Sequence, residues 1–235
     1  MMLNRANNFR ACHSTSRAGS LAPFGVGLAL LGLTLVVLVA LAVVGLQTGP
    51  RHALPVLGTI QDFVLTNQHG QRITLTELRG RVWAADIIFT RCAGPCPEMT
   101  RRMKALQDAL PSRSRILLVT LTTDPLHDSP EVLRRYGERF GANFQHWWFL
   151  TGAPDQIARL AVDGLKLTAL EIPESQRTNP ADLFIHSTTF VVVDAQGRLR
   201  ASFEAVGEDV SFEPVKRRIL GVLRRLEREA TNSPS

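Results

Sequence analysis

Cysteine is scarce in this chain of 235 residues, and the three that it holds are Cys12, Cys92 and Cys96. Only Cys92 and Cys96 follow the long apolar run near the N-terminus, whereas Cys12 precedes it. If that run crosses a membrane, Cys12 lies on the other side and cannot join the pair. Any disulfide or metal–thiolate site after the run must therefore use Cys92 and Cys96.

Long runs of one charge sign are also lacking, although the formal net charge is +6. The arginines are spread over several expected helices and the tail, and acidic residues stand among them. This pattern is typical of a solvated basic surface and argues against a nucleic-acid partner. The positive net charge instead predicts attraction to anionic lipid or to an acidic partner.

Charged side chains are missing altogether from residues 18–50. Within that stretch residues 23–46 are almost wholly apolar, which is long enough to cross a bilayer core of about 30 Å as a helix. We therefore expect an N-terminal transmembrane helix. A cleaved signal peptide is the alternative, because Ala40-Leu41-Ala42 resembles a cleavage site, but the apolar run continues past it and is long for a signal peptide.

The charges before the apolar run predict its orientation. They are Arg5, Arg10 and Arg17, with no acidic residue among them. By the positive-inside rule the N-terminus stays in the cytoplasm and everything after Pro50 is exported. The expected location is the inner membrane, with one span and the C-terminal domain on the periplasmic side. We expect a tail (residues 1–22), an anchor (23–46), a linker (47–57), one domain (58–230) and a flexible end (231–235).

The pattern of the exported part alternates between expected strands and helices. A hairpin over residues 62–65 and 72–75 comes first, and a second over 188–193 and 199–205 comes late. Between them we expect strands at 82–89, 115–121 and 146–150, helices at 98–110, 130–140 and 154–162, and a long excursion without clear period at 164–183. An amphipathic helix over 214–229 ends the domain. This order predicts an α/β, thioredoxin-like sandwich.

The most informative motif is Cys92-Ala93-Gly94-Pro95-Cys96-Pro97, between a buried strand and a helix. The free N–H groups and the macrodipole at a helix N-terminus favour thiolate, so both sulfurs are expected to be activated. A thioredoxin-like redox motif has two residues between its cysteines, whereas this one has three. The wider turn leaves room for a third ligand around one ion. Pro97 fits the first helical position.

Three further residues are candidates for this site. His186 precedes the strand expected beside the one that leads to the cysteines, and two thiolates with one imidazole suit Cu(I). A capping or surface role for His186 remains open. Asp124 follows the next strand and is either an outer carboxylate of the site or part of a turn. Arg91 either offsets the charge of a thiolate-bound Cu(I), lowering the thiol pKa, or is an ordinary surface residue.

The exported part carries an ordered set of segments, namely 89–97, Thr123-Asp124-Pro125 with Asp128-Ser129-Pro130, 148–152, His186-Ser187, and 191–194 with Gly197. With this set it resembles, over residues 58–204, the Sco/SenC family of copper-binding, membrane-anchored thioredoxin-fold proteins. The resemblance implies that Cys92, Cys96 and His186 bind copper, as Cu(I) or also as Cu(II). It also implies delivery of copper to, or maturation of, the dinuclear copper site of cytochrome c oxidase. Ala93 is a departure, since many relatives have proline there.

Three functions fit this pattern. The favoured one is a copper chaperone, which is not an enzyme and whose partners are the copper-site subunit of the oxidase, the membrane and a thiol reductant of the exported compartment. The second is a thiol–disulfide reductase, with Cys92 and Cys96 as its redox-active pair. Such reductases carry a cis-proline before the strand facing the cysteines, and here that position reads His186-Ser187-Thr188. The third, a structural disulfide, explains neither the helix N-terminus nor His186.

Overall fold

The computed structural model describes residues 30–41, 54–173, 175 and 184–232. Two compact units divide the chain, residues 1–53 and 54–235. In the first unit, residues 30–41 form a helix whose leucine and valine side chains are exposed. The expected anchor spans residues 23–46, and its remaining parts, residues 23–29 and 42–46, lie outside the described residues. No helix in the described part of the chain is long and apolar enough to cross a membrane.

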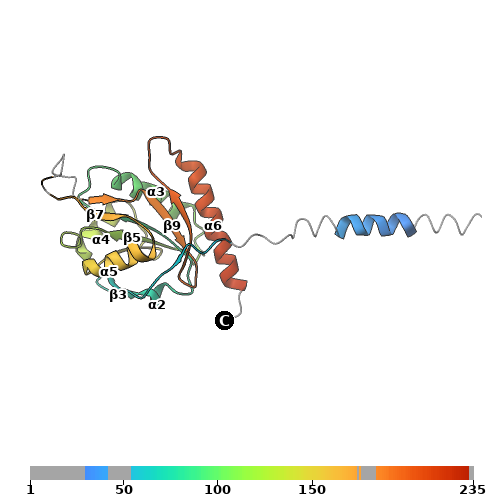
Figure 1. The fold of residues 1–235 in the computed structure, drawn as a ribbon, viewed down its shortest axis with the longest axis horizontal. Helices are drawn as coiled ribbons and strands as arrows, with labels where there is room; N and C mark the ends of the chain where they lie inside the picture. Colours follow the sequence, from blue (N-terminus) through green and yellow to red (C-terminus); the bar gives the residue numbers. More distant parts are fainter. Residues whose placement is uncertain (1–29, 42–53, 174, 176–183, 233–235) are drawn as a thin grey trace, which may run out of the picture. The chain divides into compact units, whose positions relative to one another are not determined.

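The second unit is built on an eight-stranded mixed sheet of order β1-β10-β9-β4-β5-β6-β2-β3 (Figure 1). Its centre consists of β4 (Trp83–Ile88), β5 (Leu117–Thr122) and β6 (Trp147–Thr151), which run parallel to one another. On one side β9 (Thr189–Val193) and β10 (Arg198–Glu204) are antiparallel additions, followed by the short β1 (Gly58–Thr59). On the other side lie β2 (Val64–Asn67) and β3 (Arg72–Thr74).

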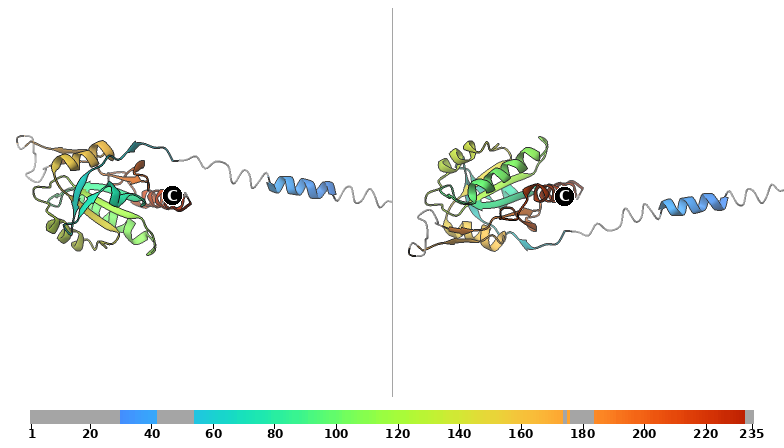
Figure 2. Two further views of the ribbon diagram at one scale, coloured as in Figure 1. Left: turned by 90° about the horizontal axis from the view of Figure 1, so that it is seen from below. Right: turned by 90° about the horizontal axis from the view of Figure 1, so that it is seen from above.

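Helices cover both faces of this sheet, as the two opposite views of Figure 2, from below and from above, show. One face carries α3 (Cys96–Ala109), α4 (Pro130–Arg139) and α6 (Phe212–Asn232). The other carries α2 (Leu75–Leu78), α5 (Pro154–Ala158) and the π-helical turn η1 (Arg159–Gly164). Such a three-layer arrangement around a mixed sheet is the thioredoxin-like sandwich that the alternating pattern predicts, so the fold class of the domain is confirmed.

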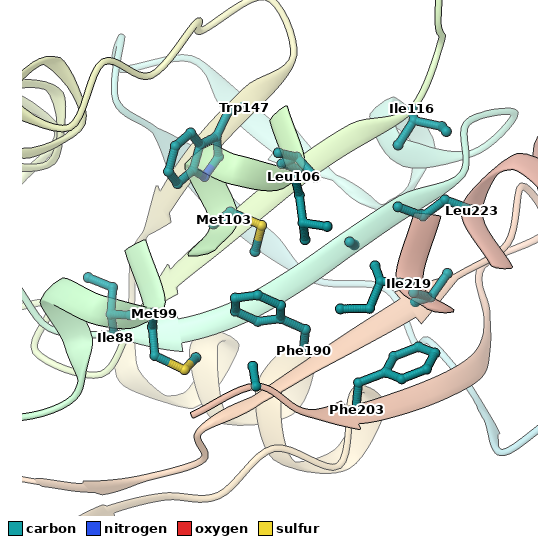
Figure 3. Packing of buried hydrophobic residues seen from close by; sticks show 14 of the residues in the cluster. Ile88, Met99, Met103, Leu106, Ile116, Trp147, Phe190, Phe203, Ile219 and Leu223 are labelled. Atoms are coloured by element: carbon teal, nitrogen blue, oxygen red, sulfur yellow. The ribbon is translucent and has the colours of Figure 1, made fainter. Parts of the chain in front are cut away.

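Strand alternation explains why two cores form. Along β4, Ala84 and Ile88 face the cluster under α3 and α6, whereas Trp83, Ala85 and Ile87 face the cluster under α5. The central strands are buried on both faces, and for this reason they read as continuous apolar runs. Figure 3 shows the first cluster, in which the following side chains converge: Met99, Met103, Leu106, Phe190, Ile219 and Leu223.

Both expected hairpins and the final helix are present, with boundaries shifted by a few residues. One expectation needs correction. The excursion at residues 164–183 contains a strand, β7 (Ala169–Glu171), which pairs antiparallel with β8 (Phe184–His186) to form a separate two-stranded sheet. Three-residue strands are too short to display a recognisable alternation of polar and apolar residues, so this pairing left no pattern in the sequence.

Candidate functional site

The site lies at the carboxyl edge of the parallel strands, where chain segments that are distant in sequence meet. The cysteine turn follows β4, and the segment from Thr123 to Ser129 follows β5. Because β4 and β5 are parallel neighbours in register, with Ile88 opposite Thr122, both segments leave the sheet at the same edge. This edge of an α/β sheet is where such folds place their ligands.

Cys92 and Cys96 occupy different environments within one turn. Cys96 is the first residue of α3 and is 0% exposed, whereas Cys92 is half-buried beside the exposed Ala93 and Gly94. Neither cysteine is in a disulfide, and a side-chain hydrogen bond joins the two. The helix begins at Cys96 rather than Glu98, so Pro97 is the second helical residue, where it still removes no helical hydrogen bond. Cys92 is thus the more exposed cysteine of the pair.

The electrostatics of Cys96 differ from the sequence-based expectation. Burial raises the pKa of the Cys96 thiol, and the neighbouring Cys92 and the Asp86 carboxylate act in the same direction. The expectation that the helix N-terminus activates both sulfurs is therefore wrong for Cys96, because desolvation outweighs the favourable backbone dipoles. Cys96 remains protonated at neutral pH until a metal ion or a disulfide bond replaces its proton.

Arg91 and Asp124 are brought together by the fold. Asp124 is only 5% exposed, and its Oδ2 accepts hydrogen bonds from Arg91 Nη2 at 2.5 Å and from Nε at 3.0 Å. This ion pair joins the residue just before Cys92 to the segment after β5. Arg91 therefore has a local anionic partner in addition to any charge at the sulfurs, and Asp124 is more than a turn residue.

A second carboxylate, Asp128, proves to be part of the same region. Asp128 and Ser129 both precede Pro130, where α4 begins, and the cap of this helix is Ser129, whose hydroxyl accepts from the Val132 N–H. Asp128 is fully buried and instead accepts hydrogen bonds from Thr90 and Thr122. No local signal distinguishes this role from capping, since an aspartate before a helix fits both.

His186 is the last residue of β8, and its backbone position is compatible with the expected role. β9 runs antiparallel to β4, so the chain that enters β9 lies at the same sheet edge as the cysteine turn. The Ser187 N–H donates to Thr168 O at 3.1 Å, which ties this segment to the chain before β7. The side chain of His186 lies outside the described ones, so its ligation stays a prediction. No group of three metal-ligating side chains occurs among those that are described.

Two further methionines and two further histidines among the described residues are either buried in the core or exposed to solvent. Met99 and Met103 are fully buried among apolar side chains (Figure 3). His69 and His127 are exposed. Cys12 lies outside the described residues. The candidate donor set therefore consists of the two sulfurs on one turn and the His186 segment at the same edge, and soft sulfur ligands fit a thiophilic ion.

Together, the sandwich and the paired thiols define a thioredoxin-like dithiol protein. The chain belongs to the SCO1/SenC family, whose model matches residues 55–217. The SCO1 protein homologue of Bacillus subtilis is 30% identical over 158 residues, which cover 66% of this chain and 78% of that protein.

Solved structures agree in fold. Bradyrhizobium japonicum ScoI with copper bound has a TM-score of 0.55 at 21% identity and covers 72% of this chain and 99% of that one. BsSco, described as having a disulfide switch and as a member of the Sco family of cytochrome c oxidase assembly proteins, has a TM-score of 0.58 at 23% identity. Its match covers 75% of this chain and 98% of that one. At these identities the likeness establishes the thioredoxin-like fold.

Proposed function

We propose that this protein is a membrane-anchored, extracytoplasmic copper chaperone that delivers copper to, or matures, the dinuclear copper site of cytochrome c oxidase. The observation that carries the proposal is the pair of cysteines on one turn, which form no disulfide and of which one is half-buried and the other buried. Family membership and the copper bound in ScoI support it. Copper is here a cargo, held by Cys92, Cys96 and His186.

The asymmetry of the two thiols suits a cargo that must be handed on. Cu(I) accepts two or three soft ligands and exchanges them one at a time. The sulfur of Cys92, at the exposed end of the turn, is the one that an incoming partner thiolate can displace first. Cys96 stays buried at the start of α3 and keeps the ion until the partner supplies another ligand. Arg91 and Asp124 are proposed to border this exchange as outer residues.

Reduction of a partner's disulfide is the second candidate function, and the same two thiols, which form no disulfide in the structure, favour it. Cys92 would attack the partner disulfide and Cys96 would resolve the mixed disulfide. The test is to mix the protein with the purified copper-binding domain of the oxidase, once as Cu(I)-loaded donor and once as dithiol facing the oxidised domain. Transfer of Cu(I) without net reduction of the oxidised domain supports the chaperone function. Reduction of that domain without Cu(I) transfer would contradict it and favour the reductase function.

Copper binding should depend on pH. The Cys96 thiol has a raised pKa and must lose its proton to bind Cu(I), so protons compete with the metal. Between pH 6 and 8 the apparent Cu(I) affinity should therefore rise by about tenfold per pH unit for each proton released. Competition with a Cu(I) chelator, corrected for the chelator's own protonation, measures this slope. An affinity independent of pH would contradict the assignment of Cys96 as a ligand.

The membrane topology is a separate part of the proposal. Residues 23–46 are proposed to anchor the chain, with Arg5, Arg10 and Arg17 holding the N-terminus in the cytoplasm. A reporter enzyme that works only outside the cytoplasm should be active when it is fused after Ser235, and one that works only in the cytoplasm should be inactive there. The full-length chain should sediment with membranes. A soluble, shortened exported form would show that Ala40-Leu41-Ala42 is cleaved and that no anchor remains.

A further inference from the structure

The turn that carries Cys92 is held mainly from the neighbouring segment after β5. Asp128 Oδ2 accepts from the Thr90 N–H at 3.0 Å, and Asp128 Oδ1 accepts from the Thr90 hydroxyl at 2.5 Å. Both hydrogen-bond donors of Thr90 are thus fixed by one carboxylate. Since Thr90 is two residues before Cys92, this contact sets where the turn leaves β4.

Asp128 is itself held firmly, which allows it to act as a support. It is 0% exposed, its Oδ2 also accepts from the Thr122 hydroxyl at 2.5 Å, and its N–H donates to Asp124 O at 2.8 Å. Thr122 is the last residue of β5, in the centre of the sheet. A buried carboxylate with three hydrogen-bond donors is a rigid connection between that strand and the cysteine turn.

The two cysteines depend on this connection to different extents. Cys96 is fixed by helix α3 and the core, and Thr100 on the same helix donates to its carbonyl oxygen at 2.9 Å. Cys92 lies on the turn itself, where its N–H donates to Phe89 O at 3.2 Å and the next two residues are exposed. The relative position of the sulfurs therefore depends on how well residues 89–92 are held.

We propose that Asp128 is a positioning residue that, through Thr90, keeps the Cys92 sulfur within bonding range of Cys96. Releasing the turn lowers the effective concentration of one sulfur at the other, which weakens every state in which both act together. These states are the Cys92–Cys96 disulfide and the coordination of copper by both sulfurs. This proposal concerns the same site as the proposed function and rests on it in one respect, namely that the Cys92–Cys96 dithiol is the functional group.

The test is the equilibrium of the dithiol with glutathione, which needs neither copper nor a partner. One oxidised glutathione takes two electrons and two protons from Cys92 and Cys96 and becomes two reduced glutathione molecules, while one S–S bond forms in the protein. For Asp128→Ala we expect the equilibrium constant of this reaction to fall about tenfold. Asp128→Asn, which keeps one acceptor oxygen, should lie between that variant and the parent.

A matched control separates positioning from general destabilisation. Asp194 is a second buried carboxylate, 3% exposed, which accepts from Arg198 and Arg200 beyond the end of β9. That end of β9 pairs with Trp83, at the edge of the sheet away from the cysteines. Asp194→Ala should lower the free energy of unfolding and leave the glutathione equilibrium unchanged. Equal shifts of that equilibrium in Asp128→Ala and Asp194→Ala would overturn the proposal.

A second variant keeps the proposal falsifiable if Asp128→Ala does not fold. Thr90→Val removes only the hydroxyl bond to Asp128 and should shift the equilibrium in the same direction by a smaller factor. In the double variant Thr90→Val, Asp128→Asn the shifts should be less than additive, because both act on one contact. If the single variants Thr90→Val and Asp128→Asn both keep the parental glutathione equilibrium, the proposal is overturned. If the variants shift the glutathione equilibrium as expected but the parent transfers no copper to its partner, only the chaperone function is overturned and the positioning role of Asp128 stands.

Discussion

Replacing either Cys92 or Cys96 with serine is expected to lower the Cu(I) affinity of the reduced protein by on the order of 100-fold or more, because a hydroxyl is a hard and weak ligand for this ion. The parent should bind one Cu(I) per chain. Each variant should be compared with Cys12→Ser, which changes the third cysteine of the chain and should bind copper as the parent does.

The two serine variants should differ in their side effects. Cys96 is fully buried at the start of α3, so Cys96→Ser places a hydroxyl in the core, and its unfolding should be measured beside its copper binding. Cys92 is half-buried on the turn, and Cys92→Ser should unfold close to the parental midpoint. Parental copper affinity in both variants would show that the metal, if bound, is bound elsewhere.

Oxidation of the pair is expected to abolish Cu(I) binding altogether, which is the second large effect. In the disulfide both sulfurs are bonded to each other and neither is available as a thiolate, whereas the structure holds them as two thiols joined by a hydrogen bond. Copper titration of the oxidised protein, followed by titration of the same sample after reduction, measures the difference. Full copper binding by the oxidised form would exclude the two sulfurs as ligands.

The strand–turn–helix around the cysteines could be predicted from the sequence because its signals are local. A continuous apolar run, a Gly-Pro turn and an amphipathic helix follow one another, and the structure confirms them as β4, the turn and α3. The position of the His186 segment at the same sheet edge follows from topology, since β9 pairs antiparallel with β4.

The parts that the sequence did not reveal depend on contacts between distant residues. Asp128 has the sequence context of a helix cap, yet its carboxylate is used by Thr90, which lies in another segment of the chain. The pKa of Cys96 depends on its complete burial, and a position at a helix N-terminus indicates the opposite direction. In both cases a long-range effect overrides a local preference that is correct in isolation.

The most direct test of the account is rescue of oxidase copper-site assembly in cells that lack this protein, under limiting copper. The chaperone function predicts rescue by the parent, none by Cys92→Ser, and poor rescue by His186→Ala, because loss of the imidazole weakens copper binding while thiol exchange needs only the sulfurs. His186→Ala should retain glutathione exchange in vitro, which serves as its control. Full rescue by His186→Ala, with none by Cys92→Ser, would contradict copper delivery and make the protein a thiol reductase.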